Sequence, residues 1–333
     1  MSVLRWGLMS TARINAKVLP ALRACPRAAA VAVASRSLEG ARAYAEAHGL
    51  EQAFGSYEAM LADPDIDAVY VSLPNHLHAE WTIRAAEAGK HVLCEKPLAL
   101  DVDDVDAIAA AAVANSVVVT EAFMYRHHPQ TRRVLELIAS GAIGEVCLVR
   151  GSFSFPLTNP GDVRLDPVMG GGSAWDVGVY PISYARTVIG RAPDAVSAHR
   201  HLGPTGIDLW CLGTLHFGDG VSAQFDSSFA APYRTNLEIV GTRGLIVLDN
   251  PFKPGRRSVV RVGPAGDHLE EVIVEAGADL YDYEIADLTA AVLDGAPLGV
   301  DLADSRANTA TVVAAHRSAA KGGIRTAVGE TTP

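Results

Sequence analysis

The chain has 333 residues, more than a single hydrophobic core normally reaches, so we expect two domains. Its composition, 49% hydrophobic and 20% charged, is that of a globular protein, and the net charge of −10 argues against a general binder of nucleic acid or of anionic membranes. Its apolar runs are too short to span a bilayer, and the N-terminus lacks the apolar core of a signal peptide. These features predict a cytoplasmic protein with a small-molecule ligand.

The first 122 residues alternate between short apolar runs and helical patterns, which predicts a doubly wound parallel sheet, the Rossmann form of the α/β class. The expected strands cover residues 3–8, 28–34, 68–73, 91–94 and 117–120. The helical patterns between them end near residue 24 and then cover 38–48, 79–88 and 102–114.

Residues 123–333 have a different pattern, which predicts an α+β domain with a mostly antiparallel open sheet. Its alternating runs cover 146–155, 194–201, 207–217, 221–230, 234–240, 244–248, 257–263 and 269–274. Helical patterns cover 129–140, 173–189, 281–294 and 303–320. A flat sheet face of this kind suits self-association, so we expect a homodimer or homotetramer.

The turn after the first expected strand has a degraded form of the G-x-G-x-x-G dinucleotide fingerprint. Gly7 is present, but Met9 and Ala12 occupy the second and third glycine positions, and Ser10 stands where related turns often carry glycine. Ser10 and Thr11 can donate hydroxyl groups to phosphate, and Arg13 and Ile14 begin the helix. The alternative is a plain strand-to-helix turn, which would also need a glycine for its backbone conformation. The β/α units that follow favour a dinucleotide-binding turn over this alternative.

The end of the second expected strand bears on the choice between NAD and NADP. An acidic residue there binds the ribose hydroxyls of NAD, whereas arginine and small polar groups accommodate the extra phosphate of NADP. This chain has Ser35-Arg36-Ser37 and no carboxylate before Glu39, which favours NADP over NAD. The alternative is that Arg36 is only a solvated surface cation.

Four segments resemble the motifs of the Gfo/Idh/MocA family of NAD(P)-dependent oxidoreductases, and the resemblance covers nearly the whole chain. Glu95-Lys96-Pro97 follows a strand, at the sheet edge where α/β proteins bind ligands, and the proline is expected to form a cis bond. The other segments are Leu73-Pro74-Asn75-His76-Leu77-His78, Glu121-Ala122-Phe123-Met124-Tyr125-Arg126 with the following His127-His128-Pro129-Gln130, and Arg164-Leu165-Asp166-Pro167 with Gly170-Gly171-Gly172 and Asp176-Val177-Gly178-Val179-Tyr180-Pro181.

This resemblance implies that Lys96 lies near the nicotinamide and the reacting carbon, and that Asp176 and Tyr180 line the substrate pocket. The inositol-dehydrogenase branch has histidine where this chain has Tyr180. The chain is more similar to the branch with dimeric dihydrodiol dehydrogenase, D-xylose 1-dehydrogenase, glucose–fructose oxidoreductase and the sugar 3-ketoreductases. The segment from Tyr281 resembles the family's helix that returns toward the active site, although it could serve packing alone.

Oxidation of a carbinol requires a group that takes the hydroxyl proton, and Tyr180 is the candidate. The ordinary pKa of a phenol, about 10, is high for a base at neutral pH, but an adjacent ammonium favours the phenolate, and Lys96 is the natural neighbour. Asp176 and Tyr180 are four positions apart and so share one face of a helix. Each residue also has a purely structural alternative: Tyr180 could be a core tyrosine, and Asp176 could cap a helix.

The predicted catalytic residues are Lys96, Tyr180 and Asp176, and Arg126 and His127 join them as expected substrate contacts. No metal site is expected, since His127 and His128 lack the spacing and carboxylate of a helical metal site, and the four cysteines contain no CxxC pair. The predicted cofactor-binding residues are Gly7, Ser10, Thr11, Ala12, Arg13, Ile14, Ser35, Arg36, Ser37, Leu73, Asn75, His78, Glu95, Lys96 and Arg164.

The sequence therefore predicts an NADP-dependent oxidoreductase that acts on a sugar or a similar cyclic polyol or diol. Two alternatives stay open. One is a biosynthetic keto-sugar reductase, because the His127-His128-Pro129-Gln130 segment also resembles sugar 3-ketoreductases. The other is a non-catalytic NADP-binding sensor, because Rossmann domains can bind dinucleotides without chemistry.

Overall fold

The computed structural model describes residues 2–329 with the exception of 265 and 267. The chain divides into two compact units, one made of Met1–His127 and Ala278–Ser305 and the other of His128–Gly277 and Arg306–Pro333. The domain boundary expected after residue 122 stays a prediction, and the contact-based division adds the returning segment Ala278–Ser305 to the first unit.

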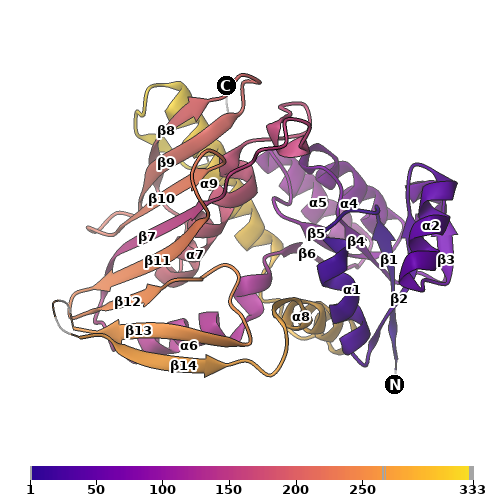
Figure 1. Ribbon diagram of the computed structural model, residues 1–333, viewed down its shortest axis with the longest axis horizontal. Helices are drawn as coiled ribbons and strands as arrows, with labels where there is room; N and C mark the ends of the chain where they lie inside the picture. The colour runs from indigo at the N-terminus through magenta and orange to yellow at the C-terminus, as the bar shows by residue number, and fades with distance from the viewer. Residues whose placement is uncertain (1, 265, 267, 330–333) are drawn as a thin grey trace. The chain divides into compact units, whose positions relative to one another are not determined.

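The first unit contains a parallel sheet with the Rossmann strand order, as predicted (Figure 1). In the described residues it has six strands in the order β3-β2-β1-β4-β5-β6. The order reverses between β1 and β4, and this switch point is where such sheets bind dinucleotides at their carboxyl ends. The strands are β1 (Leu4–Met9), β2 (Ala28–Ala34), β3 (Gln52–Phe54), β4 (Ala68–Val71), β5 (His91–Glu95) and β6 (Val119–Ala122).

Both faces of this sheet are covered by helices, because its strands are apolar on both sides. In β4, Val69 and Val71 pack into one core while Ala68 and Tyr70 pack into the other. The first core also contains side chains of α3 (Tyr57–Leu61), α4 (His78–Glu87) and α5 (Val102–Ala114). The second contains side chains of α1 (Asn15–Ala24), α2 (Leu38–His48) and the returning helix α8 (Leu280–Asp294).

The sequence pattern missed one β/α unit. The strand β3 has three residues and the helix α3 has five, which is too short for either periodicity to stand out. The two-residue strand Thr326–Ala327 near the C-terminus was not predicted either. The other strands and α-helices lie within a few residues of their predicted ranges, and β2, α2 and α5 match them fully.

The second unit contains a larger sheet that is mostly antiparallel, as predicted, with one parallel pair, β7 and β10. Its order among the described residues is β14-β13-β12-β11-β7-β10-β9-β8-β15. The strands are β7 (Val146–Ser154), β8 (Ala195–Leu202), β9 (Asp208–His216), β10 (Ser222–Ser228), β11 (Arg234–Gly241), β12 (Leu245–Leu248), β13 (Arg257–Gly263), β14 (Glu270–Glu275) and β15 (Thr326–Ala327).

The helix α7 (Val179–Ile189) packs against β7 and β10, while α6 (Pro129–Ala139) packs against β13 and β14 (Figure 1). The long helix α9 (Leu302–Ala320) begins in the first unit and ends in the second. A π-helical turn, Ala174–Gly178, leads directly into α7. Single π turns inside helices are rare and are frequently found at functional sites.

Candidate active site

The turn between β1 and α1 is held by a small polar network. Ser10 has a positive φ of 132°, a conformation that costs a non-glycine residue about 1–3 kcal/mol. Its hydroxyl accepts from the Ala12 amide at 3.1 Å and lies 2.8 Å from Ser72 Oγ, which in turn donates to Asn15 Oδ1 at 2.9 Å. Ser72 and Asn15 are buried, and the sequence analysis missed both. The network fixes the turn, because three hydrogen bonds offset the strained backbone.

At Gly7, neighbouring side chains of the same unit leave little room for a side chain. A methyl group on Gly7 would lie 2.6 Å from Met60 Sδ and 3.4 Å from Ile66. At the start of α1, Ile14 at the N-cap position makes no side-chain capping bond, and the amides of Asn15, Ala16 and Lys17 donate to backbone carbonyl oxygens of the preceding turn. The first amides of α1 therefore already have partners within the chain.

Ser35, Arg36 and Ser37 follow β2 as predicted. Ser35 is half-buried, and Arg36 and Ser37 are exposed. Ser37 also caps α2, because its hydroxyl accepts from the Gly40 amide at 3.2 Å. Arg36 is thus an exposed cation between two serines in the sequence, a set of donors that suits a phosphate.

The turns after β4 and β5 are joined by His78. Its Nε2 lies 2.7 Å from the carbonyl oxygen of Leu73, and its Nδ1 lies 2.7 Å from that of Pro97. The ring is 1% exposed, and burial lowers the pKa of His78. Both ring nitrogens of His78 therefore contact backbone carbonyl oxygens of the first unit. The Lys96–Pro97 peptide bond is cis, as expected from the sequence.

A group of buried and half-buried acids and phenols surrounds Glu95, the residue before Lys96. Tyr70 donates its hydroxyl to Glu95 Oε1 at 2.5 Å, and Glu284 of α8 is 2% exposed. Burial, together with the charge of Glu95, raises the pKa of Glu284 well above its usual range. The same two causes raise the pKa of Tyr281. Burial thus favours the neutral form of Glu284, which the sequence analysis did not foresee.

In the second unit, Asp176 is held by an arginine. Arg164 Nε donates to Asp176 Oδ2 at 2.9 Å, and Arg164 Nη1 lies 3.2 Å from Asp162 Oδ1. The charge of Asp176 is the largest cause that raises the pKa of Arg164. The Arg164 side chain is 40% exposed, whereas that of Asp176 is 12% exposed. The pair therefore presents a buried carboxylate beside a cation that solvent or a ligand can reach.

Tyr180 lies in the first turn of α7 among aromatic rings. Its ring centroid is 5.4 Å from that of Phe153 and 5.6 Å from that of Phe252, and the residue is 5% exposed. Tyr233, which is 58% exposed, meets the edge of Phe153. Lys253 places its ammonium 5.3 Å from the Phe153 ring centroid. Apolar surroundings of this kind hold a phenol in place and exclude water from it.

Asp208 of β9 fixes the start of the π-helical turn that carries Asp176. Asp208 Oδ2 accepts from Ser173 Oγ at 2.7 Å and from the Ala174 amide at 2.8 Å. A methyl group on Gly172, where φ is 126°, would lie 2.4 Å from Asp208 Oδ1. The absence of a side chain at Gly172 thus allows the Asp208 carboxylate to lie close to the backbone. The capping role considered for Asp176 falls instead to Asp208, which no sequence motif marked.

Arg126 and His127 have carboxylate partners within the first unit. Arg126 Nη1 lies 2.8 Å from Asp304 Oδ2 at the start of α9, and His127 Nδ1 lies 3.3 Å from Asp287 Oδ2 in α8. These two ion pairs link the returning segment Ala278–Ser305 to the last residues of Met1–His127. The expectation that either residue contacts substrate stays a prediction.

In the described part of the chain, no cluster of three or more His, Cys, Asp or Glu side chains has an arrangement that could hold a metal ion. No helix in those residues has both the length and the apolar character needed to cross a bilayer. Cys94 and Cys211 are buried free thiols, while Cys25 and Cys147 are half-buried.

The fold and these side chains define a class of protein. A parallel sheet in this strand order, with a helix directly after the β1 turn and a lysine just beyond the carboxyl end of β5, is the arrangement of a dinucleotide-binding oxidoreductase.

Comparisons with known proteins agree with this class. Residues 4–123 match the model of an oxidoreductase family with an NAD-binding Rossmann fold, and residues 131–247 match the GFO/IDH/MocA C-terminal domain. A D-xylose 1-dehydrogenase (NADP(+)) from Haloferax volcanii is 37% identical over 95% of this chain and 98% of its own length. A trans-1,2-dihydrobenzene-1,2-diol dehydrogenase from Xenopus laevis is 35% identical over 73% of this chain and 74% of its own.

Among solved structures, the 3-ketoreductase KijD10 from Actinomadura kijaniata, in complex with NADP and TDP-benzene, matches with a TM-score of 0.89. It is 35% identical, and the match covers 95% of this chain and 98% of that one. Structures of that reductase have also been solved with one tyrosine or one lysine replaced. The chain therefore belongs to the Gfo/Idh/MocA family and is an NAD(P)-dependent oxidoreductase of the class that acts on CH–OH groups.

Proposed function

We propose that the chain is an NADP-dependent oxidoreductase for a sugar or a similar cyclic polyol or diol, with Tyr180 as the acid/base and Lys96 as its assistant. The observation that carries this proposal is the combination of family membership with the retained Lys96, Asp176 and Tyr180. When bound, the nicotinamide would take a hydride from the carbinol carbon or return one to the carbonyl carbon.

The first unit has residues that fit this cofactor. The turn between β1 and α1 is proposed to hold the pyrophosphate, and Ser35, Arg36 and Ser37 offer donors for a 2′-phosphate. The residues proposed to line the cofactor also include Leu73, Asn75, Glu95 and Lys96. NADP is preferred over NAD in this proposal, in keeping with the xylose dehydrogenase and the 3-ketoreductase named above.

In the second unit, we propose that Tyr180 accepts the proton of the substrate hydroxyl during oxidation and returns it during reduction. Phe153 and Phe252 restrict the ring, and Asp176 would accept a hydrogen bond from a substrate hydroxyl while Arg164 holds its carboxylate in place. A phenolate next to an ammonium is favoured electrostatically, which is the role proposed for Lys96.

A second candidate function is reduction of a keto-sugar in biosynthesis, and the likeness to the 3-ketoreductase structure favours it. The same residues serve both directions, because the acid/base that removes a proton from the alcohol delivers it to the carbonyl oxygen.

A panel of sugars, diols and nucleotide-linked keto-sugars, assayed with both cofactors by the absorbance of reduced nicotinamide, tests the proposal. NADP-dependent turnover of free sugars supports the dehydrogenase, whereas turnover confined to keto-sugars supports the reductase. Tight NADP binding without turnover of any compound would contradict both and favour the sensor.

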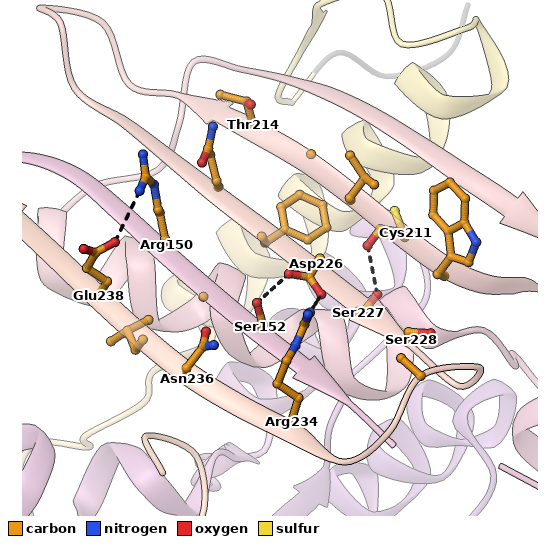
Figure 2. Close-up of a pocket in the computed structure, with 18 of the residues that line it drawn as sticks. Arg150, Ser152, Cys211, Thr214, Asp226, Ser227, Ser228, Arg234, Asn236 and Glu238 are labelled. Atoms are coloured by element: carbon orange, nitrogen blue, oxygen red, sulfur yellow. Dashed lines mark hydrogen bonds and ion pairs between the residues drawn. The ribbon is translucent and has the colours of Figure 1, made fainter. Parts of the chain in front are cut away.

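We also propose self-association through the open face of the larger sheet, as a homodimer or homotetramer. This face has a hollow of about 1050 Å³. Figure 2 shows side chains of β7, β9, β10 and β11 that line it. Charged groups in it pair with one another, Arg150 with Glu238 at 3.4 Å and Arg234 with Asp226. Leu212 on the same face is 44% exposed. The pairing of charges lowers the cost of covering the face with a second copy.

Light scattering at several concentrations tests this assembly. Leu212→Asp should shift the mass toward that of one chain, whereas Val113→Asp, which changes an 81% exposed apolar residue on α5, should not. An unchanged mass for the Leu212 variant would contradict the proposed face. The cytoplasmic location expected from the sequence stays a prediction.

A further inference from the structure

The turn that carries Lys96 is fixed on the side of the preceding residue. Glu95 ends β5, and its Oε1 accepts the hydroxyl hydrogen of Tyr70 at 2.5 Å. Tyr70 is fully buried in β4, the neighbouring strand. A phenol held by packing thus determines where the Glu95 side chain lies, and Lys96 is the next residue.

The residue after Lys96 is fixed as well. The carbonyl oxygen of Pro97 lies 2.7 Å from Nδ1 of the buried His78 ring. His78 begins α4, so this contact joins the turn to a helix on one face of the sheet.

The third contact comes from a buried carboxylate. Glu121 in β6 is 1% exposed, and its Oε1 accepts from the Leu98 amide at 3.0 Å. In the sheet, Glu121 is the register partner of Cys94, so it lies beside the carboxyl end of β5. Leu98 is fully buried, and loss of the acceptor would leave its amide without this bond at a cost of about 1–3 kcal/mol.

Three polar side chains from three elements thus hold the residues on both sides of Lys96. A buried carboxylate is expensive in a core, and an apolar residue would pack there at lower cost. The contacts of Glu121 therefore point to a purpose beyond stability, namely the placement of the turn.

We propose that Glu121 is a positioning residue for Lys96, which sets the direction in which the lysine side chain leaves the turn by holding the Leu98 amide. The catalytic part of this inference rests on the proposed function, since it takes Lys96 as the assistant of the acid/base. The placement of Lys96 itself can be measured without turnover.

The same strand offers a matched control at its other end. Lys90 precedes β5, is 7% exposed, and donates from Nζ to the carbonyl oxygens of Asp63 at 2.7 Å and Ile66 at 2.8 Å. Lys90 is thus also a buried charged residue bound to backbone, but at the amino end of β5. Lys90→Met should lower stability without moving the turn at the carboxyl end.

The experiment compares Glu121→Met, which fills the volume without a comparable acceptor, with Glu121→Gln, which keeps an acceptor oxygen. The chain has few lysines, namely Lys17, Lys90, Lys96, Lys253 and Lys321, so ¹³C-methylated lysine signals can be resolved by NMR. The signal of Lys96 is identified with Lys96→Arg. Kinetic constants, the dissociation constant of NADP and Tm are measured in parallel on unmethylated protein.

We expect Glu121→Met to shift the Lys96 signal and to lower kcat on the order of 10–100-fold, with NADP affinity changed less than kcat. Glu121→Gln should restore both readouts. Lys90→Met should lower Tm but leave the Lys96 signal and kcat near wild type. Should Glu121→Met fail to fold, Glu121→Asp, which retracts the carboxylate, should shift the Lys96 signal in the same direction.

An unshifted Lys96 signal in a folded Glu121→Met or Glu121→Asp variant would overturn the proposal, even if Tm falls. If the wild-type protein turns over none of the compounds tested, the proposed function fails. The NMR signal of Lys96 still decides the role of Glu121 in that case.

Discussion

Arg164 donates its Nε hydrogen to Asp176 Oδ2 at 2.9 Å, so a cation from the turn near residue 164 holds the carboxylate of the π-helical turn. Asp208 holds the start of the same turn through Ser173 and Ala174. The carboxylate is mostly buried while the guanidinium is 40% exposed, so a substrate hydroxyl could approach the pair from the side of the arginine. Two of the predicted site residues thus act as one unit.

Asp176→Asn should lower kcat/KM at least about tenfold with little loss of stability, because the amide keeps an oxygen for Arg164 but loses the charge. Arg164→Met should lower kcat/KM by a similar factor and destabilise the fold by about 1 kcal/mol or less, since the ion pair is partly exposed. Kinetics and thermal unfolding check both. Wild-type kinetics in both variants would remove this pair from the active site.

Arg36→Ala should weaken NADP binding about 10–100-fold and leave NAD binding nearly unchanged, because only NADP carries the phosphate that the guanidinium would bind. Arg42→Ala is the matched control, since Arg42 is also exposed and lies on α2. Fluorescence titration with each dinucleotide checks the effect. Equal weakening for both dinucleotides would mean that Arg36 does not select the cofactor.

Most of the fold could be predicted from sequence because its strands and helices have clear periodicities, as β2 and α5 show. The motifs identified the site residues through family resemblance. The residues that hold them could not be found in this way. Asp208 is 35 positions from Ser173, and Glu121 is 23 positions from Leu98, so these contacts depend on strand pairing that no local pattern reveals. The π-helical turn depends on the same long-range contacts.

Stability should fall between pH 6.5 and about 4 in part because of His128. Burial, followed by the charge of Arg132, lowers the pKa of His128 to about 4, and its Nδ1 caps α6 by accepting from the Gln130 amide. In this range the unfolded chain takes up a proton that the folded chain does not, so the stabilisation present above pH 6.5 is lost as the pH falls.

His128→Asn isolates this contribution, because asparagine can cap the helix and does not titrate. The free energy of unfolding of the wild type should fall relative to that of the variant by roughly 2–3 kcal/mol between pH 7 and pH 4. Denaturant unfolding at each pH measures the difference. Parallel curves for the two proteins would show that His128 is not the titrating group.

Glu284→Gln should have the opposite pH dependence. Burial raises the pKa of Glu284, so its contribution to stability is fully present below about pH 4.5, the ordinary pKa of the carboxyl, and is lost as the pH rises toward the higher pKa of the folded state. The wild type should therefore lose stability relative to the glutamine variant as the pH rises from 4.5 to 8. A difference that stays constant over this range would mean that Glu284 is ionised in the folded protein.

The central claim is that Tyr180 exchanges the substrate proton and that Lys96 assists it, and steady-state kinetics of Tyr180→Phe and Lys96→Ala with NADP and a sugar substrate test this most directly. Each variant should lose on the order of 10²–10⁴-fold in kcat while the dissociation constant of NADP changes much less. Undiminished kcat in both variants, with NADP bound as in the wild type, would contradict the account.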